Sequence, residues 1–326
     1  MITFDKRLIR TLSLLGPSGA YGAAASEISE NNEKAVFLTA DLCFFSGLEK
    51  YKKTYPERLY NFGIAEQNML GAAAGFAKEG FIPFVSTYAS FCCSRCADQA
   101  RVCMSYMNLP IKLVGLTAGY GAGILGATHM SVEDISVFRA LPNVVVISPA
   151  DCTEIIKALV ATSENDNPTY IRLTGPMNTP VVYKEDYEFK IGKAVHLKDG
   201  DEICLLATGS MVYNSLKAAE ILEKNNLSCS VINIHTLKPL DIECVLEASR
   251  KHKIIACVEE HNVIGGLFSA VSEVLVQEKI RPPVIPIGIR DKFVPPGEYG
   301  YQLEMSGLTP DQIAMQIMSQ YKHEKP

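Results

Sequence analysis

A single acidic residue precedes an unusual run of small residues in the first quarter of the chain. Glu66 comes shortly before Gly71–Gly75, which contains only glycine and alanine. We expect a helix that begins at Glu66, where the partial positive charge of the helix terminus stabilises a carboxylate. Burial among Phe62, Ile64 and Met69 would instead favour the neutral acid. Glu66 is therefore a candidate for proton transfer, and an acidic residue that simply favours the first helical turn is an equally good interpretation.

Three further polar residues follow predicted strands or turns. His129 ends the motif GATH, after a glycine-rich turn. Arg172 lies near the carboxyl end of a predicted strand, where open α/β sheets place ligands. Asp41 also follows a strand directly. His129 and Asp41 have ordinary alternatives, because loop histidines are usually structural or solvated and a loop carboxylate often caps a helix.

A cluster of cysteines invites a metal site. Cys92, Cys93 and Cys96 lie together, with Cys103 beyond. They fall in a predicted helix, with no second CxxC pair and no nearby histidine, so we reject a zinc or iron–sulfur site. The ten cysteines are scattered through apolar segments, which favours buried free thiols in a reducing compartment.

The elements that must position these residues alternate between short apolar runs and longer amphipathic stretches. The predicted strands span 35–40, 81–86, 111–116, 144–148 and 169–173, and the predicted helices span 66–78, 91–106, 132–140 and 152–163. Such alternation builds a parallel sheet covered by helices on both faces.

A second series follows a polar, proline-bearing stretch over 175–198, which we interpret as a linker. Its predicted strands span 202–207, 229–234, 253–259 and 283–288, and its predicted helices span 211–225, 241–252, 266–278 and 310–321. The fold class is therefore α/β with two domains, each a mostly parallel sheet flanked by helices. We place the first domain at 1–180, the linker at 181–200 and the second domain at 201–326.

The composition restricts the classes of function. The chain has 326 residues, a net charge of −5 and 48% hydrophobic residues, as in soluble globular proteins. This charge gives no electrostatic reason to expect nucleic acid or an anionic membrane as a partner. No apolar stretch approaches the roughly 20 residues of a membrane span, and the start of the chain is too interrupted for a signal peptide. We expect a cytoplasmic protein.

The segment GIAEQNMLGAAAGFAKEGFIPFVSTYASF resembles the cofactor pyrimidine-binding segment of transketolases and of the related deoxyxylulose-phosphate synthase. The resemblance continues, in order, through Ala40–Leu42, Gly126–His129 with Glu133 and Asp134, Leu141–Asp151 and Val258–Leu267. It therefore covers nearly the whole chain. It implies a thiamine-diphosphate-binding fold of the pyrimidine-domain type, followed by the family's C-terminal domain.

The resemblance also implies roles for individual residues. Glu66 matches the glutamate that hydrogen-bonds N1′ of the cofactor pyrimidine and so activates the thiazolium, and Phe91 matches the aromatic that stacks on the pyrimidine, with Tyr88 beside it. His129 matches an active-site histidine that contacts the donor sugar or moves protons. Arg172 matches the arginine that holds substrate phosphate, and Asp41 matches an aspartate near the donor sugar.

One part of the family's site is missing. The cofactor diphosphate and its metal ion require a GDG motif followed about thirty residues later by asparagine, whereas the nearest string here, Asp199-Gly200-Asp201, runs straight into a predicted strand. We therefore expect no metal ligand in this chain. A partner N-terminal subunit with the GDG…N domain would hold Mg²⁺ or Ca²⁺, and self-association would give a 2+2 assembly.

Several residues depart from the usual family pattern. Thr117 and Leu125 stand where typical single-chain transketolases carry a histidine and an aspartate, and Ala127 replaces the proline of the GPTH motif. Arg95 comes one place later than in some relatives. Lost contacts to sugar hydroxyls change which substrate is accepted, so the usual pentulose and hexulose phosphate donors are in doubt. A modified sugar phosphate, or a sulfo- or deoxy-ketose, stays open.

The leading hypothesis is a transketolase subunit that transfers a two-carbon ketol unit from a ketose, expected to be phosphorylated, to an aldose. A first alternative, with the same cofactor, acts on a 2-oxoacid, as deoxyxylulose-phosphate synthase or the β-subunit of a 2-oxoacid dehydrogenase does. A second alternative is a non-catalytic regulatory or scaffolding subunit. The presence of Glu66, Phe91 and His129 together argues against it.

Overall fold

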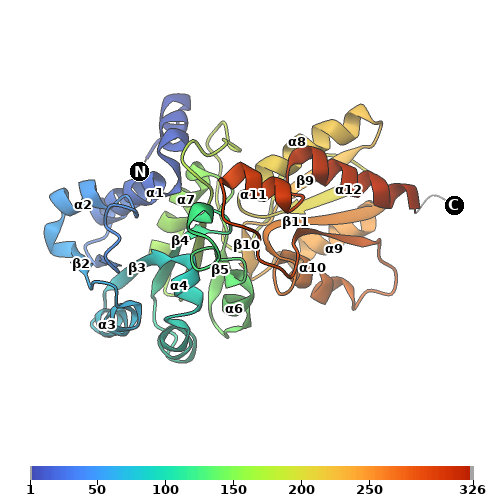
Figure 1. The fold of residues 1–326 in the computed structure, drawn as a ribbon. Coiled ribbons are helices and arrows are strands. Elements are labelled where there is room, and N and C mark those ends of the chain that lie inside the picture. The colour runs from blue at the N-terminus through green and yellow to red at the C-terminus, as the bar shows by residue number, and fades with distance from the viewer. Residues whose placement is uncertain (1, 324–326) are drawn as a thin grey trace.

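The computed structural model of the chain describes residues 2–323 and contains two sheets that lie side by side (Figure 1). One sheet has seven strands and the other has five. Both are mostly parallel, with one antiparallel edge strand each. This confirms the predicted α/β class. No helix in the described part of the chain has both the length and the apolar character needed to span a membrane.

The first sheet has the strand order β10-β5-β6-β4-β3-β1-β2. Its strands are β1 (Ala35–Thr39), β2 (Leu59–Asn61), β3 (Ile82–Tyr88), β4 (Lys112–Ala118), β5 (Val145–Ile147), β6 (Thr169–Thr174) and β10 (Thr236–Lys238). The central strands are buried almost throughout, as expected for parallel strands covered on both faces. Five of the seven were predicted to within two residues, whereas the short β2 and β10 were not.

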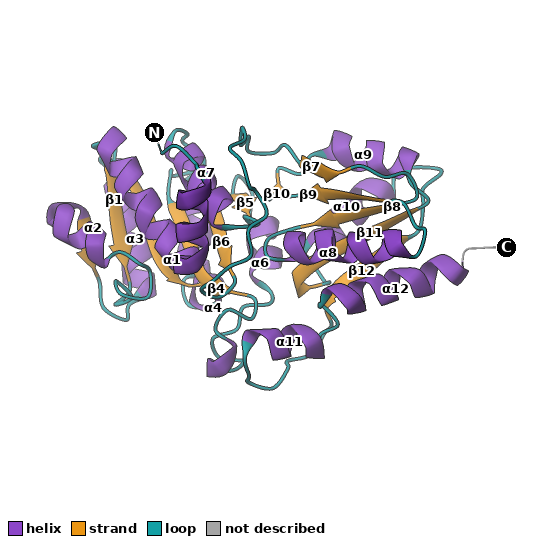
Figure 2. Cartoon of the chain, turned by 90° about the horizontal axis from the view of Figure 1, so that it is seen from above, coloured by secondary structure: helices purple, strands orange, loops and turns teal. Residues whose placement is uncertain are grey.

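The helices of the first domain cover this sheet (Figure 2). They are α1 (Lys6–Asn31), α2 (Glu49–Thr54), α3 (Glu66–Lys78), α4 (Ala89–Cys93), α5 (Ala97–Gln99), α6 (Asp134–Ala140) and α7 (Cys152–Ser163), with 3-10 turns η1 (Pro56–Arg58) and η3 (Gly123–Leu125) and a π-helix η2 (Ala100–Tyr106). Helices α3 and α7 have the predicted bounds. Helix α1 was not predicted, because Gly16 (φ 73°) and Pro17 interrupt its pattern.

The predicted helix over 91–106 is wrong as a single element. The structure divides it into α4, α5 and η2, with non-helical backbone at Cys96 (φ −109°, ψ 21°). Such local departures from regular α-helical geometry often occur at functional sites. The break lies one residue after Arg95.

The second sheet has the order β12-β11-β8-β9-β7. Its strands are β7 (Val195–Lys198), β8 (Ile203–Ala207), β9 (Cys229–Asn233), β11 (Ile254–Asn262) and β12 (Val284–Ile289), and its helices are α8 (Met211–Lys224), α9 (Ile242–Lys251), α10 (Leu267–Leu275), α11 (Tyr299–Met305) and α12 (Pro310–His323). Helices α8 and α12 lie on one face and α9 and α10 on the other (Figure 1). Strand β7 lies at the end of the stretch that we interpreted as a linker.

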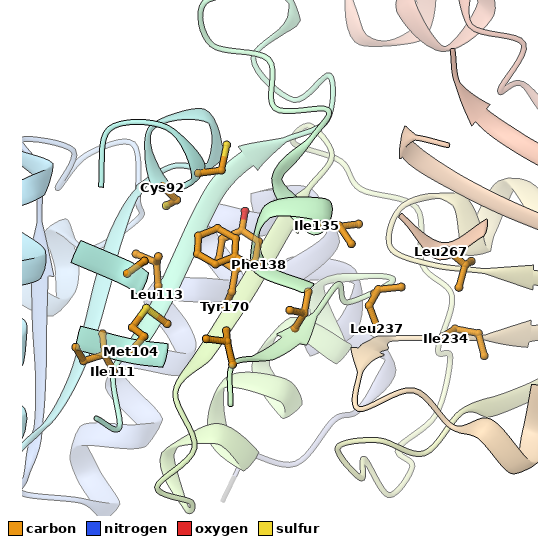
Figure 3. Packing of buried hydrophobic residues seen from close by; sticks show 14 of the residues in the cluster. Cys92, Met104, Ile111, Leu113, Ile135, Phe138, Tyr170, Ile234, Leu237 and Leu267 are labelled. Carbon is orange, nitrogen blue, oxygen red and sulfur yellow. The ribbon is translucent and has the colours of Figure 1, made fainter. Parts of the chain in front are cut away.

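The two domains share a hydrophobic core. Strand β10 follows β9 in the chain yet pairs antiparallel with β5 of the first sheet. Beside it, Leu237 and Leu267 belong to the same buried cluster as Phe138 and Tyr170, whose rings stack at 3.9 Å (Figure 3). The second domain therefore completes the sheet of the first and packs directly against it.

All ten cysteines are free, and nine of them are buried. Cys92, Cys93, Cys96 and Cys103 belong to the shared core. Burial raises the pKa of the Cys96 thiol to about 12, so these thiols are packing groups with little thiolate at neutral pH.

Candidate functional site

Helix α3 begins at Glu66, whose side chain is buried although it lies at a helix terminus. Glu66 is 4% exposed, and its Oε1 accepts a hydrogen bond from Nη1 of Arg95 at 2.9 Å. The turn before the helix contains Gly63 at φ 71°, a conformation that glycine adopts readily. Met69 is buried as expected, whereas Ile64 is 77% exposed. The prediction that Ile64 would shield Glu66 is wrong, because this residue lies in the turn outside the helix and faces outward.

Three rings of the first domain form a cluster. Tyr88 ends β3, Phe91 lies in α4, and His129 follows η3. Their centroids are 5.7 Å apart for Tyr88 and Phe91, 5.5 Å for Tyr88 and His129, and 5.3 Å for Phe91 and His129. All three pairs meet edge to face, an arrangement that aromatic rings favour. The structure thus brings together three of the residues that we singled out from the sequence.

Arg95 connects this ring cluster to Glu66. Its guanidinium carbon lies 3.6 Å from the centroid of the Phe91 ring, while Nη1 donates to the Glu66 carboxylate. The Arg95 side chain is 46% exposed. We did not assign this arginine to the site from the sequence, since its ion pair depends on the break between α4 and α5.

The loop that carries His129 is held at both ends and along its length. Gly119 and Ser131 form an antiparallel bridge, and His129 Nδ1 lies 2.9 Å from Oγ1 of Thr128. The second domain supports the loop from outside, because Glu260 Oε1 accepts a hydrogen bond from the backbone N–H of Tyr120 at 2.6 Å. The position of His129 therefore depends on contacts between the domains.

Arg172 does not join this cluster. Its side chain is 1% exposed, and it donates to Asp134 at 2.8 Å, to the carbonyl of Glu260 at 2.8 Å and to Thr174 at 3.1 Å. A guanidinium whose three nitrogens are engaged inside the protein is not presented to a ligand. The assignment of a substrate phosphate to Arg172 stays a prediction, and in this structure packing of the second domain encloses this end of β6.

Asp41 follows β1 with a positive φ of 59°. Its Oδ1 accepts a hydrogen bond from the Asn61 amide at 3.0 Å, and its own N–H donates to Asn61 Oδ1 at 3.0 Å. Asn61 Oδ1 also accepts from the N–H of Gly63, so this pair shapes the turn before Glu66. Asp41 is exposed and lines a shallow pocket with Lys52 and other residues.

A second group of buried ionisable residues was missed from the sequence. Besides Arg172, Asp134 accepts a hydrogen bond from the Tyr170 hydroxyl, and the carboxylate of Glu260 accepts from Ser210 and Tyr299. Burial raises the pKa of the Glu260 carboxyl. The string VEEHN was a visible signal, but no spacing rule shows that its carboxylates turn inward between two domains.

The arrangement around Glu66 suits a flat, nitrogen-bearing ring. A planar group with N–H donors, the Arg95 guanidinium, already contacts the face of Phe91 and the carboxylate of Glu66. An aminopyrimidine could use the same face and the same carboxylate. A metal ion has no comparable place, since within residues 2–323 no three His, Cys, Asp or Glu side chains are grouped so that they could hold one.

Comparison with protein families assigns both halves of the chain. Residues 17–178 match the transketolase pyrimidine-binding domain, and residues 192–313 match the transketolase C-terminal domain. The matches follow the order of the two sheets. Bacterial 1-deoxy-D-xylulose-5-phosphate synthases are also similar, and the chain spans about half of their length.

Two relatives are similar over most of their length. A putative transketolase C-terminal section from Methanocaldococcus jannaschii is 36% identical, with 95% of this chain and 97% of that protein covered. A 6-deoxy-6-sulfo-D-fructose transketolase subunit from Clostridium sp. is 38% identical, with 88% of each covered. Among solved structures, a split-gene transketolase described as an inactive β4 tetramer superimposes with a TM-score of 0.84. It is 36% identical and covers 93% of this chain and 97% of its own.

Proposed function

Because this chain belongs to the transketolase family, we propose that it is the pyrimidine-binding subunit of a thiamine-diphosphate-dependent transketolase. This subunit would work together with a partner chain and transfer a two-carbon ketol unit from a ketose to an aldose. The observation that carries the proposal is the grouping of a buried carboxylate, Glu66, with the rings of Tyr88, Phe91 and His129. These groups come from three separate segments of the chain.

Each residue would have a distinct task. Glu66 would share a proton with a ring nitrogen of the pyrimidine, a role that benefits from shielding from water. Phe91 and Tyr88 would bind the ring by stacking. When bound, the cofactor supplies the carbon nucleophile that attacks the ketose carbonyl. His129, next to both aromatics, would hydrogen-bond the donor sugar or move a proton at its carbonyl, and Asp41 would lie near the donor sugar.

The partner subunit would supply what this chain lacks. The diphosphate of the cofactor needs a divalent cation with oxygen ligands, and the residues 2–323 offer no group of side chains that could hold one. A partner with a GDG…N domain would hold Mg²⁺ or Ca²⁺. The similar split-gene protein is described as inactive when it forms a β4 tetramer, which supports a division of the site between two chains. A 2+2 assembly is the simplest arrangement.

The donor is open to experiment. Arg172 is enclosed, so it would hold a substrate phosphate only after exchanging its contacts inside the protein. Thr117 has a φ of 51°, unusual for a β-branched residue, and its buried Oγ1 has no hydrogen-bond partner among the described residues. The relative that acts on 6-deoxy-6-sulfo-D-fructose makes a sulfo-ketose a specific donor to test beside xylulose and fructose phosphates.

A second candidate function is condensation of a 2-oxoacid with an aldehyde. The similarity to 1-deoxy-D-xylulose-5-phosphate synthases over 94% of this chain favours it. It would use the same Glu66 and Phe91 and differ in the donor, which would be pyruvate. A dehydrogenase-type subunit would instead need a lipoyl acceptor.

The test is a donor screen with the reconstituted complex. The chain and its partner would be co-purified and supplied with thiamine diphosphate and magnesium. Turnover with a ketose and an aldose is the expected result. Turnover that requires pyruvate as the donor, with an aldehyde as the acceptor, would favour the second candidate. Absence of turnover with every donor, together with absence of cofactor binding, would support a non-catalytic subunit.

A further inference from the structure

Arg95 makes the two contacts that we assign to the cofactor pyrimidine. Its guanidinium lies over the Phe91 ring with 3.6 Å between its central carbon and the ring centroid. At the same time Nη1 donates to Glu66 Oε1 at 2.9 Å. A guanidinium is flat, delocalised and bears N–H donors, and it stacks well on aromatic faces. An aminopyrimidine has the same shape and presents the same kind of edge.

The two groups cannot use these contacts together. The rings of Tyr88 and His129 also lie against Phe91, with centroids at 5.7 Å and 5.3 Å from its own. A pyrimidine that used the same face of Phe91 and the same oxygen of Glu66 would meet the guanidinium at both places. Binding in this position requires Arg95 to leave.

The local structure allows Arg95 to leave. Its side chain is 46% exposed, so a displaced guanidinium reaches water without crossing the core. The residue lies outside α4, which ends at Cys93, and α5 begins only at Ala97. Its displacement therefore disturbs no regular helical turn.

We propose that Arg95 is a placeholder in the pyrimidine site: it pairs with Glu66 and covers Phe91 until the pyrimidine of thiamine diphosphate displaces it. This inference rests on the proposed function. The pair keeps a buried carboxylate from being left without a partner, which is costly in protein interiors. Every binding event then includes the loss of this pair, so Arg95 lowers the affinity for the cofactor. In the cofactor-free protein, the same arginine gives the Glu66 carboxylate a charged partner.

The sign of one substitution tests the proposal. In the reconstituted complex, Arg95→Gln removes the competing cation, and we expect the dissociation constant of thiamine diphosphate, measured by titration calorimetry, to fall about 3- to 10-fold. Arg95→Lys keeps the charge without the flat stacking group, so the dissociation constant should fall by less than in Arg95→Gln. Arg101→Gln, which removes an exposed arginine from the neighbouring η2, is the matched control and should leave the constant unchanged.

Other outcomes separate two kinds of failure. If the wild-type complex binds the cofactor but Arg95→Gln binds it equally well or more weakly, Arg95 is not a placeholder and the proposed function still stands. If the wild-type complex binds no thiamine diphosphate, the proposed function fails, and this inference fails with it. Should Arg95→Gln not fold, an Arg95→Lys complex with unchanged or weaker binding would overturn the proposal.

Discussion

Two arginine–carboxylate pairs of nearly equal length lie in different surroundings. Arg95 and Glu66 are 2.9 Å apart, and the arginine side chain is 46% exposed. Arg172 and Asp134 are 2.8 Å apart, and both side chains are almost completely buried. The first pair is made by one hydrogen bond and a ring face, whereas the guanidinium of the second also donates to Thr174 and to the carbonyls of Ser131 and Glu260. A pair that water can reach can be exchanged for a ligand, and a pair that is enclosed serves as a scaffold.

The enclosed pair of Arg172 and Asp134 supports the loop that carries His129. Arg172 donates to the carbonyls of Ser131 and Glu260, which belong to the His129 loop and to the second domain. Glu260 in turn accepts from Tyr120 at the start of that loop. The second domain therefore holds the segment that carries His129.

The largest expected loss of stability follows from removing the enclosed arginine, Arg172. Arg172→Met should lower the free energy of unfolding by about 3–5 kcal/mol, because it leaves the buried Asp134 without its cation. Urea unfolding followed by circular dichroism measures this change. Arg95→Gln is the comparison in the same assay and should cost less, about 1–2 kcal/mol, because water reaches the arginine side of the pair although Glu66 is buried. Equal losses in the two variants would remove the distinction between the pairs.

A smaller effect on stability concerns Glu259, a fully buried residue. Its carboxyl accepts hydrogen bonds from the backbone N–H groups of Leu267 and Phe268. Burial raises its pKa from 4.5 to about 7. Between these values the folded protein holds a proton that the unfolded chain has lost, so this group's contribution to stability falls as pH rises through that window.

Replacing Glu259 with glutamine should remove this pH dependence. We expect the free energy of unfolding of Glu259→Gln to change less between pH 4.5 and 7 than that of the wild type, by on the order of 1–3 kcal/mol. Chemical unfolding at a series of pH values measures it. Glu247→Gln, an exposed change on α9, is the control. An unchanged slope in Glu259→Gln would show that this carboxyl stays ionised.

The smallest expected effect concerns stacking of the cofactor on Phe91, next to the partly exposed Arg95–Glu66 pair. Phe91→Leu keeps an apolar residue in α4 but removes the ring face, and should raise the dissociation constant of thiamine diphosphate about 2- to 10-fold, or ~0.5–1.5 kcal/mol. Calorimetry with the reconstituted complex measures it, with Phe81→Leu as a change of the same size outside the ring cluster. Equal constants for Phe91→Leu and the wild type would exclude Phe91 as the stacking residue.

Local signals made the central part of the site predictable. The glycine- and alanine-rich run after Glu66 fixed the bounds of α3, and apolar runs located the central strands to within two residues. The resemblance to transketolases then singled out Tyr88, Phe91 and His129, which the structure brings together.

The features that could not be predicted from the sequence depend on contacts between distant segments. Arg172 had the right residue type at the right end of a strand, and only the packing of β11 of the second domain decided that it faces inward. The pairing of β10 with the first sheet has the same cause. Arg95 pairs with Glu66 across 29 residues, because the helix breaks beside it.

The central claim is that the Glu66 carboxylate activates a cofactor whose other end is bound by a second chain. Turnover of the reconstituted complex with Glu66→Gln, at saturating thiamine diphosphate and magnesium, tests it most directly. We predict a loss of about 10²–10⁴-fold relative to the wild type, while the two chains still co-purify. Turnover within twofold of the wild type would contradict the account.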